Sequence, residues 1–506
     1  MTLDGVLAVL ARLGRPGTVV DGTTDVQVVG LSADSRAVVP GDLYAALPGA
    51  RHHGAAFSVE AATNGAVALL TDPDGLASAR TAGLPVVLVA EPRSVLGALA
   101  AAVHGHPDSR LLVLGVTGTN GKTTTTYLLD AGLRAAGHRT GLVGTVETRA
   151  GDEVVASVRT TPEAPDVQRL LARMVASGCT AVSMEVSSHA LALGRVDGTT
   201  FDVAQFTNLS QDHLDFHLTL EDYYAAKADL FSPERSRHGV IDVDSPWGAR
   251  LAAEASIPVT TVSSGLGLSG PDPAAHWRAS DIVLGPDGST FVAQGPTGES
   301  VPVSLALPGP FNVANALGAV ATLAVAGVPA GDAASGIAAL AGVPGRMERI
   351  DAGQPYLALV DYAHTPDAVR AALSAVRTTT EGRVVCVIGC GGDRDRDKRV
   401  AMGELAASGS DVLVVTDDNP RSEDPAAIRA TVLSGAALGT GRTTVLEVAD
   451  RAEAISTAVQ HSRPGDVVVV LGKGHEQGQE AGGATRPFDD RAALAAALAE
   501  QGGEGA

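Results

Sequence analysis

Residues 111–137 read LLVLGVTGTNGKTTTTYLLDAGLRAAG, and this stretch decides the fold. The apolar run at 111–116 is typical of a buried strand, and the segment from position 123 onward has the pattern of a helix. Between them lies a glycine-rich turn, whose backbone N–H groups can curl around a phosphate at the start of that helix. Strand, loop and helix in this order predict a phosphate-binding unit.

The loop carries residues with specific expected roles. Lys122 would reach the terminal phosphates of a nucleotide, and Thr123 would offer its hydroxyl to magnesium. The common P-loop spacing requires glycine at position 116, where Val116 stands, so a plain glycine turn is the alternative explanation. We predict an ATP site that includes Gly118, Thr119, Asn120, Gly121, Lys122, Thr123 and Thr124.

The sequence on both sides of this unit predicts an α/β protein with three domains, because 506 residues exceed what one hydrophobic core usually serves. Residues 1–108 mix short apolar runs with Gly/Pro turns and form a small N-terminal domain. Residues 109–343 form a central P-loop ATPase-like domain with a parallel sheet, whose strands end in polar side chains. Residues 344–506 alternate apolar strands with helical patterns, as in a doubly wound, Rossmann-like C-terminal domain.

Composition and charge exclude several classes of protein. The net charge of -20 argues against a nucleic-acid partner, because nonspecific affinity for phosphate backbones comes from Lys and Arg. The three cysteines lack metal-ligand spacing and favour a reducing compartment. The N-terminus lacks the pattern of a signal peptide, and no apolar run approaches the roughly 20 residues of a membrane helix. We expect a cytoplasmic protein without a membrane partner, and a monomer as the simplest state.

Three further segments carry side chains suited to a metal site: MEVSSHAL at 184–191, FTNLSQDHLDFH at 206–217 and YYAAKADLF at 223–231. Each residue alone has an ordinary explanation. Glu185 could be a solvated carboxylate at a strand end, His213 a structural histidine and Lys227 a solvated charge on a helix. Together with GTNGKTT, however, these segments resemble the Mur ligase family of ATP-dependent amide ligases in cell-wall precursor synthesis, and the resemblance covers nearly the whole chain.

The resemblance implies a carbamylated lysine. In the family the residue matching Lys227 is modified by CO2 to N6-carboxylysine, which helps to hold Mg²⁺ together with the residues matching Thr123, Glu185 and His213. The chemistry is sensible, because a partly buried lysine loses its proton readily and only the neutral amine captures CO2. The implied catalytic set is Lys122, Glu185, His213 and Lys227.

The resemblance also implies further nucleotide contacts and a site for a UDP-muramoyl dipeptide. Helix capping is the plain alternative for Asn312, and a capped helix after a strand is the alternative for the loop at Asp361. The N-terminal domain would grip the uridine of the UDP-sugar. The implied nucleotide contacts are Asn312, Arg346, Asp361 and His364, and the implied dipeptide-substrate contacts are Ser35, Thr160, Thr161, Ser187 and Arg195.

Three polar loops in the C-terminal domain resemble those with which diaminopimelate-adding members hold the incoming amino acid: GCGGDRDRDKR at 389–399, TDDNPRSEDP at 416–425 and LGKGHEQGQ at 471–479. The far carboxylate of meso-diaminopimelate calls for a cation, preferably a guanidinium that forms a bidentate pair. Arg421 supplies one, and Glu476 is a plausible partner for an ammonium. The implied contacts are Arg394, Asp418, Asn419, Pro420, Arg421, Gly472 and Glu476.

These features predict ATP-dependent ligation of meso-diaminopimelate to UDP-N-acetylmuramoyl-L-alanyl-D-glutamate through an acyl phosphate, with Mg²⁺ as cofactor, in peptidoglycan synthesis. A lysine-adding ligase is the closest alternative, and Arg421 disfavours it because the free ammonium of lysine would meet like charge. Folate or other glutamate-adding relatives would not need DNPR or KGHE. A nucleotide-binding regulator without catalysis is disfavoured by the intact set of Lys122, Glu185, His213 and Lys227.

Overall fold

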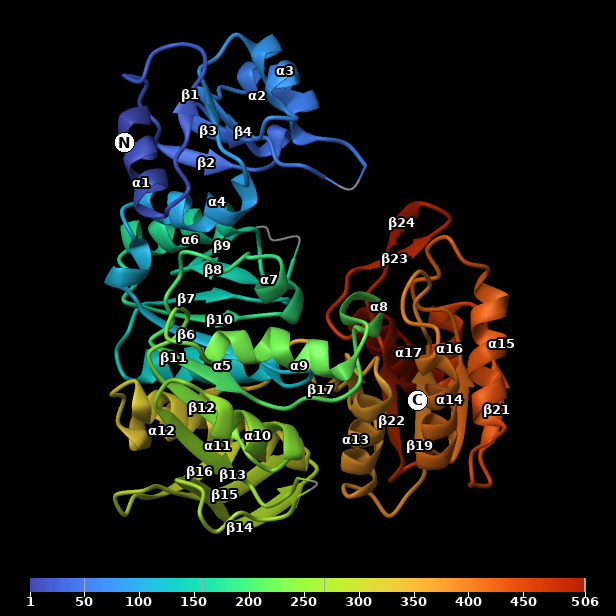
Figure 1. The fold of residues 1–506 in the computed structure, drawn as a ribbon. Helices are drawn as coiled ribbons and strands as arrows, with labels where there is room; N and C mark the ends of the chain where they lie inside the picture. The colour runs from blue at the N-terminus through green and yellow to red at the C-terminus, as the bar shows by residue number, and fades with distance from the viewer. Residues whose placement is uncertain (50, 156–158, 268, 505–506) are drawn as a thin grey trace.

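The computed structural model describes residues 1–49, 51–155, 159–267 and 269–504. It contains three large sheets, which follow one another along the chain, and one two-stranded ribbon. The N-terminal domain stacks on one end of the central domain, and the C-terminal domain lies beside the central domain (Figure 1). The predicted three-domain α/β class is thus confirmed, while the boundaries at 108 and 343 stay a prediction. No helix of the described residues has the length and apolar character needed to cross a bilayer.

The N-terminal sheet has the strand order β1-β5-β4-β3-β2, in which only β1 runs antiparallel to its neighbour. Its helices α1 and α4 cover a core that includes Leu10, Leu43 and Leu99. The elements are α1 (Leu3–Arg12), β1 (Thr18–Val19), β2 (Gly30–Ser32), β3 (Asp42–Ala45), α2 (Ser58–Thr63), β4 (Ala68–Thr71), α3 (Leu76–Ala79), β5 (Val86–Leu88) and α4 (Pro92–Val103).

The central sheet is parallel from β14 to β7, in the order β14-β13-β12-β11-β6-β10-β7, and antiparallel strands extend it at both edges. The prediction of a parallel sheet is therefore correct for the central strands, from β14 to β7. It did not include the antiparallel edge strands β15, β16, β8 and β9. Helices α5, α11 and α12 cover one face, and α6, α9 and α10 cover the other. The strands are β6 (Leu112–Thr117), β7 (Thr140–Val143), β8 (Thr148–Ala150), β9 (Glu153–Val155), β10 (Ala181–Glu185), β11 (Val203–Phe206), β12 (Gly239–Asp242), β13 (Val259–Ser263), β14 (Trp277–Gly285), β15 (Gly288–Gln294) and β16 (Ser300–Leu305). The helices are α5 (Lys122–Ala135), α6 (Ala164–Ala176), α7 (Ser188–Ala192), α8 (Leu214–His217), α9 (Leu220–Ala228), α10 (Pro246–Glu254), α11 (Pro310–Val325) and α12 (Ala330–Ala339).

The C-terminal sheet has the order β17-β18-β22-β19-β20-β21 and is parallel except for β17. Helices α13, α14 and α15 cover one face and α16 and α17 the other, which confirms the doubly wound prediction. The ribbon β23–β24 extends from the domain on the chain between β22 and α17 (Figure 1). The elements are β17 (Glu348–Arg349), β18 (Leu357–Asp361), α13 (Pro366–Arg377), β19 (Val384–Ile388), α14 (Lys398–Gly409), β20 (Val412–Val415), α15 (Pro425–Ala436), β21 (Thr444–Glu447), α16 (Arg451–Gln460), β22 (Val467–Leu471), β23 (Gly478–Ala481), β24 (Ala484–Pro487) and α17 (Asp490–Glu504).

Candidate active site

The phosphate loop joins the end of β6 to the start of α5, and its glycines are needed for close packing. Gly118 and Gly121 have φ values of 153° and 87°, and a Cβ atom on either would collide with a neighbouring side chain. The strand β11 delivers Asn208 beside the loop, where its Oδ1 accepts a hydrogen bond from Asn120 N at 3.0 Å and its main-chain O accepts one from Thr119 N at 2.9 Å. Asn208 therefore holds the loop in place, although no role was predicted for it.

Lys122 and Lys227, the two lysines predicted for the site, donate hydrogen bonds to the same main-chain carbonyl. Lys122 Nζ donates to the main-chain oxygens of Gly118 and Thr119, both at 2.9 Å, and Lys227 Nζ donates to the same oxygen of Gly118 at 2.8 Å. Lys227 projects from α9, is fully buried and lies 4.4 Å above the Tyr223 ring. Burial lowers the pKa of Lys227 well below its ordinary value, and the nearby positive charge of Lys122 lowers it further. The neutral amine is therefore accessible at this position.

Glu185, Thr123 and Arg346 also come together. Glu185 lies buried at the end of β10, where Oε1 accepts a hydrogen bond from Thr145 N at 2.7 Å and Oε2 accepts one from Thr123 Oγ1 at 3.1 Å. Arg346 Nη2, from the connection between the central and C-terminal domains, donates to Thr123 Oγ1 at 3.1 Å. These three predicted residues thus form one hydrogen-bonded group at the end of the sheet.

The donor set suits a hard cation only in part. Thr123 and Glu185 supply oxygen, which Mg²⁺ prefers, and partial burial lowers the pKa of His213, so its ring nitrogen is unprotonated at neutral pH. Within the described residues, no group of three or more His, Cys, Asp or Glu side chains is placed to hold a metal ion. A carbamate on Lys227 would add the missing anionic oxygens, so the residues fit magnesium if that lysine is modified.

Two of the residues predicted to bind the nucleotide form hydrogen bonds with other residues of the protein. Asn312 Nδ2 donates to Pro308 O at 2.8 Å at the start of α11. Asp361 accepts hydrogen bonds from the main-chain N–H groups of Met347 and Ala363, at 2.7 and 2.8 Å. Neither contact caps a helix: Gly309, not Asn312, is the N-cap residue of α11, and Thr365, not Asp361, caps α13. His364, by contrast, lines the cavity between the central and C-terminal domains.

This interdomain cavity has a volume of about 570 Å³. The central domain contributes one wall and the C-terminal domain the opposite wall, so two groups of predicted residues from distant parts of the chain face one space. Lys122, Lys227, Asn312 and Ser35 are not among the lining residues. The predicted residues that line it are Thr160, Thr161, Ser187, Arg195 and His213 from the central domain and His364, Arg394, Asp418, Asn419, Arg421, Gly472 and Glu476 from the C-terminal domain.

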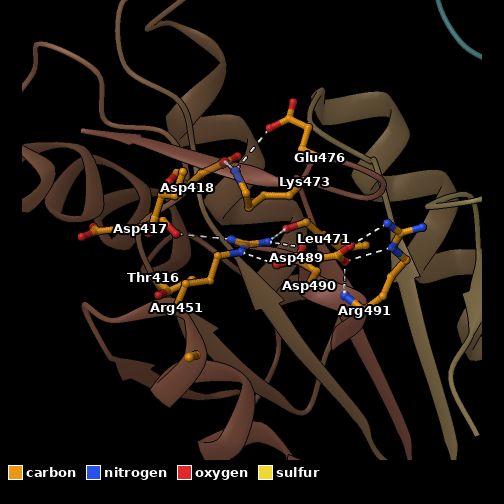
Figure 2. Close-up of polar contacts among 12 residues, drawn as sticks. Thr416, Asp417, Asp418, Arg451, Leu471, Lys473, Glu476, Asp489, Asp490 and Arg491 are labelled. Carbon is orange, nitrogen blue, oxygen red and sulfur yellow. Dashed lines mark hydrogen bonds and ion pairs between the residues drawn. The ribbon is translucent and has the colours of Figure 1, made fainter. Parts of the chain in front are cut away.

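On the C-terminal wall, Arg421 adopts a φ of 52°, and its Nη1 donates to Gly392 O at 2.7 Å. Its Nε lies 3.2 Å from Glu480 Oε2, on β23. Behind this wall, the buried Lys473 contacts both Asp418 and Glu476 (Figure 2). Lys473 was not predicted as a site residue, although it stands between two that were, because sequence alone does not show that a lysine is buried.

A second cavity of about 1060 Å³ lies between the N-terminal and central domains and contains Ser35 in its lining. Ser35 Oγ donates to Glu60 Oε2 at 2.6 Å, so this predicted contact is engaged within the N-terminal domain. Arg159 lines both cavities, which places them next to one another. Four other arginines and four carboxylates also line this cavity: Arg36, Arg93, Arg169 and Arg173, with Asp34, Glu60, Glu163 and Asp166.

Family models match most of this architecture. The model of the Mur ligase middle domain matches residues 116–323, that of the Mur ligase glutamate ligase domain matches 345–474, and that of the Mur ligase family catalytic domain matches 27–104. The chain belongs to the Mur ligase family. The resemblance predicted from the motifs is therefore confirmed, and the phosphate loop from position 118 and all residues that line the interdomain cavity, except Glu476, lie inside the matched regions.

Individual Mur ligases are similar over almost their whole length. The UDP-N-acetylmuramoyl-L-alanyl-D-glutamate--2,6-diaminopimelate ligase of Streptomyces avermitilis is 55% identical, covering 95% of this chain and 94% of that protein. The protein of the same name from Corynebacterium glutamicum is 50% identical, covering 99% and 96%. A solved structure of a ligase with this name has 32% identity and a TM-score of 0.65, covering 96% of this chain and 97% of the other.

Proposed function

We propose that this Mur ligase joins meso-diaminopimelate to UDP-N-acetylmuramoyl-L-alanyl-D-glutamate at the expense of ATP, in peptidoglycan precursor synthesis. The observation that carries the proposal is the interdomain cavity, where Thr160, Ser187 and Arg195 face Asp418 and Arg421. One wall has hydroxyl and guanidinium groups suited to a peptide carboxylate, and the other has both signs of charge, as a zwitterionic amino acid requires. The names of the most similar relatives support the same reaction.

The first step is activation of a carboxylate. The side-chain carboxylate of the substrate's D-glutamate attacks the γ-phosphorus of ATP, and the bond to ADP breaks, leaving an acyl phosphate. Lys122 leaves its contacts with the loop carbonyls and spreads the charge of the transferring group. Thr123, Glu185, His213 and a carbamylated Lys227 would hold magnesium, which would supply Lewis-acid stabilisation of that charge. Arg346, which contacts Thr123, adds a second cation beside the loop.

The second step forms the amide. The amine of meso-diaminopimelate attacks the acyl carbon, the C–O bond to phosphate breaks, and the nitrogen loses its proton. Arg421 pairs with the far carboxylate of the amino acid, while Asp418 and Glu476 accept hydrogen bonds from its remaining ammonium. Arg394, Asn419 and Gly472 line the same wall, and Pro420, which does not line it, follows Asn419 in the same loop. Enclosure between two domains limits hydrolysis of the acyl phosphate by water.

The cavity next to the N-terminal domain is the proposed site of the UDP-sugar. Its volume and its arginines suit a large anionic ligand, and Ser35 contributes to its wall. Arg159 lies at the passage from this cavity to the interdomain cavity, so one substrate could extend through both. We further propose domain boundaries at 108 and 343, a cytoplasmic location and a monomeric enzyme.

The proposal is tested by phosphate release from ATP with UDP-N-acetylmuramoyl-L-alanyl-D-glutamate, comparing meso-diaminopimelate with L-lysine. We expect turnover with diaminopimelate, and a fall of about 100-fold in kcat/KM for Arg421→Ala, because the variant leaves a buried carboxylate unpaired. Arg370→Ala, which alters an exposed arginine of α13, is the matched control and should behave like wild type.

The outcomes separate the competing activities. Equal use of L-lysine by the wild type would remove Arg421 as selector and favour a lysine-adding enzyme. Turnover with neither amine would point to another member of the family. Absence of any dipeptide-dependent ATP turnover would favour a regulator without catalysis.

A further inference from the structure

Lys473 is a buried cation directly behind the wall of the interdomain cavity. It follows β22, and its side chain is 0% exposed. Nζ lies 3.3 Å from Asp418 Oδ1, 2.9 Å from Asn419 Oδ1 and 3.2 Å from Glu476 Oε2 (Figure 2). An ammonium without partners would be strongly unfavourable in such a place, so these oxygens and the cation fix one another.

Each carboxylate gives only one oxygen to Lys473. The other oxygen of Asp418, Oδ2, lies beside Gly472, where an added Cβ would approach it to 3.1 Å. The other oxygen of Glu476, Oε1, lies 3.4 Å from the hydroxyl of Tyr362. Asp418, Gly472, Glu476 and Tyr362 all line the cavity. Lys473 thus binds the two carboxylates from behind and leaves one oxygen of each toward the cavity side.

A second buried group holds the strand ends that carry these residues. Arg451 and Asp490 are both 0% exposed and form two contacts of 2.7 Å with one another. Arg451 also donates to the main-chain oxygens of Leu471, at 3.0 Å, and Asp417, at 3.4 Å (Figure 2). Leu471 and Asp417 immediately precede Gly472 and Asp418 in the sequence. The two loops that meet at Lys473 therefore start from one rigid point.

The charges show why the cation matters. Burial raises the pKa of Asp418, but Lys473 and Arg451 outweigh that effect, and the pKa stays below its ordinary value. Without Lys473, two carboxylates would share one side of the cavity with only the amide of Asn419 between them. Like charges so close favour protonation of one carboxylate or its displacement.

We infer that Lys473 is a positioning residue of the amino-acid site: it holds the carboxylates of Asp418 and Glu476 in the orientation in which they receive the ammonium group of the amino-acid substrate. The inference deepens the proposed function and rests on it. Lys473 does not touch the reacting atoms, because its ammonium is enclosed by the protein. Its effect is therefore on recognition of one substrate out of three.

The test is Lys473→Met in the full-length enzyme, with KM measured separately for meso-diaminopimelate, ATP and the UDP-linked dipeptide. We expect KM for diaminopimelate to rise at least about 30-fold, because one member of a buried charged group is lost. The other two KM values should change less than about 3-fold. Arg383→Met is the matched control: it breaks the ion pair with Asp466 at the opposite end of β22 and should lower Tm without changing KM for diaminopimelate.

Two further measurements exclude a purely structural role. The acidic limb of the pH profile of kcat/KM for diaminopimelate should move to higher pH in Lys473→Met, because one carboxylate then gains a proton more easily. The rise in KM for Lys473→Met combined with Glu476→Gln should be smaller than the product of the two single effects. If Lys473→Met is insoluble, Lys473→Gln must show the same selective increase.

The result that overturns the inference is an equal rise in all three KM values, or an unchanged KM for diaminopimelate, in a variant that folds. Either result leaves the proposed function intact as long as the wild type turns over ATP with the dipeptide and diaminopimelate. Failure of the wild type in that assay would instead remove the proposed function itself.

Discussion

The phosphate loop and the amino-acid wall treat their cations in opposite ways. At the loop, Lys122 and Lys227 both donate to the carbonyl of Gly118, so the positive charges are folded back onto the protein's own backbone. At the wall, Arg421 lines the cavity while it contacts Gly392 O and Glu480, and the buried Lys473 supports the carboxylates from behind. The two loop lysines must exchange internal contacts for those of a nucleotide, whereas the wall's two carboxylates are already held in place at the cavity.

The largest effect should come from breaking the loop side. Lys122→Met should lower kcat at least about 1,000-fold, because a preorganised cation at the transferring phosphoryl group is lost. KM for meso-diaminopimelate should change little, since the C-terminal wall does not depend on Lys122. Steady-state phosphate release measures both quantities. Arg134→Met, which removes the half-exposed partner of the buried Asp130 on the same helix α5, is the control and should keep wild-type kcat.

A parallel rise in KM for diaminopimelate in Lys122→Met would show that the two regions are not independent. In that case the amino-acid wall would need a nucleotide bound at the phosphate loop before it could bind diaminopimelate. The proposed contrast between the two regions would then be wrong.

Carbamylation of Lys227 is a second prediction for the phosphate-loop region, where both lysines now donate to the protein's own backbone. Burial and the nearby charge of Lys122 lower the pKa of Lys227, which favours the neutral amine that captures CO2. We expect a carbamate carbon signal in NMR spectra of wild-type enzyme equilibrated with ¹³C-bicarbonate, and none in Lys227→Met. The variant should lose about 100-fold in kcat, as expected when a ligand to magnesium is missing.

Bicarbonate itself provides a check on that prediction. Activity of the wild type should fall in CO2-depleted buffer and return when bicarbonate is added, whereas Lys227→Met should respond to neither change. Full wild-type activity without CO2 would mean that the unmodified lysine is sufficient.

The two regions also differ in how far sequence could predict them. The loop follows from local pattern, because Gly118 and Gly121 stand between a buried strand and a helix that begin in the structure within one residue of their predicted starts. Its partner Lys227 lies 109 residues away along the chain and was assigned only by resemblance. The wall was assigned by resemblance too, and the roles of its residues stay a prediction.

What sequence did not predict are features that depend on tertiary burial and pairing. Lys473 looks like a loop lysine until the fold encloses it. Likewise Asn208 gains its role only when β11 lies beside β6. The antiparallel strands β15 and β16 have one exposed face, and their alternating pattern was not recognised among the more apolar parallel strands.

The smallest expected effect concerns Glu480, which pairs with Arg421 across the wall. The contact of 3.2 Å is half exposed on the Glu480 side, so solvent screens it and its contribution is small. Glu480→Gln should free the guanidinium for the far carboxylate of diaminopimelate and lower KM for that substrate about 3-fold, with kcat unchanged. Glu447→Gln, which breaks a comparable exposed pair with Arg429, is the control and should leave KM unaltered. If KM rises in Glu480→Gln, the carboxylate must orient Arg421 rather than compete for it, and the wall is then preorganised by its surface pair as well as by Lys473.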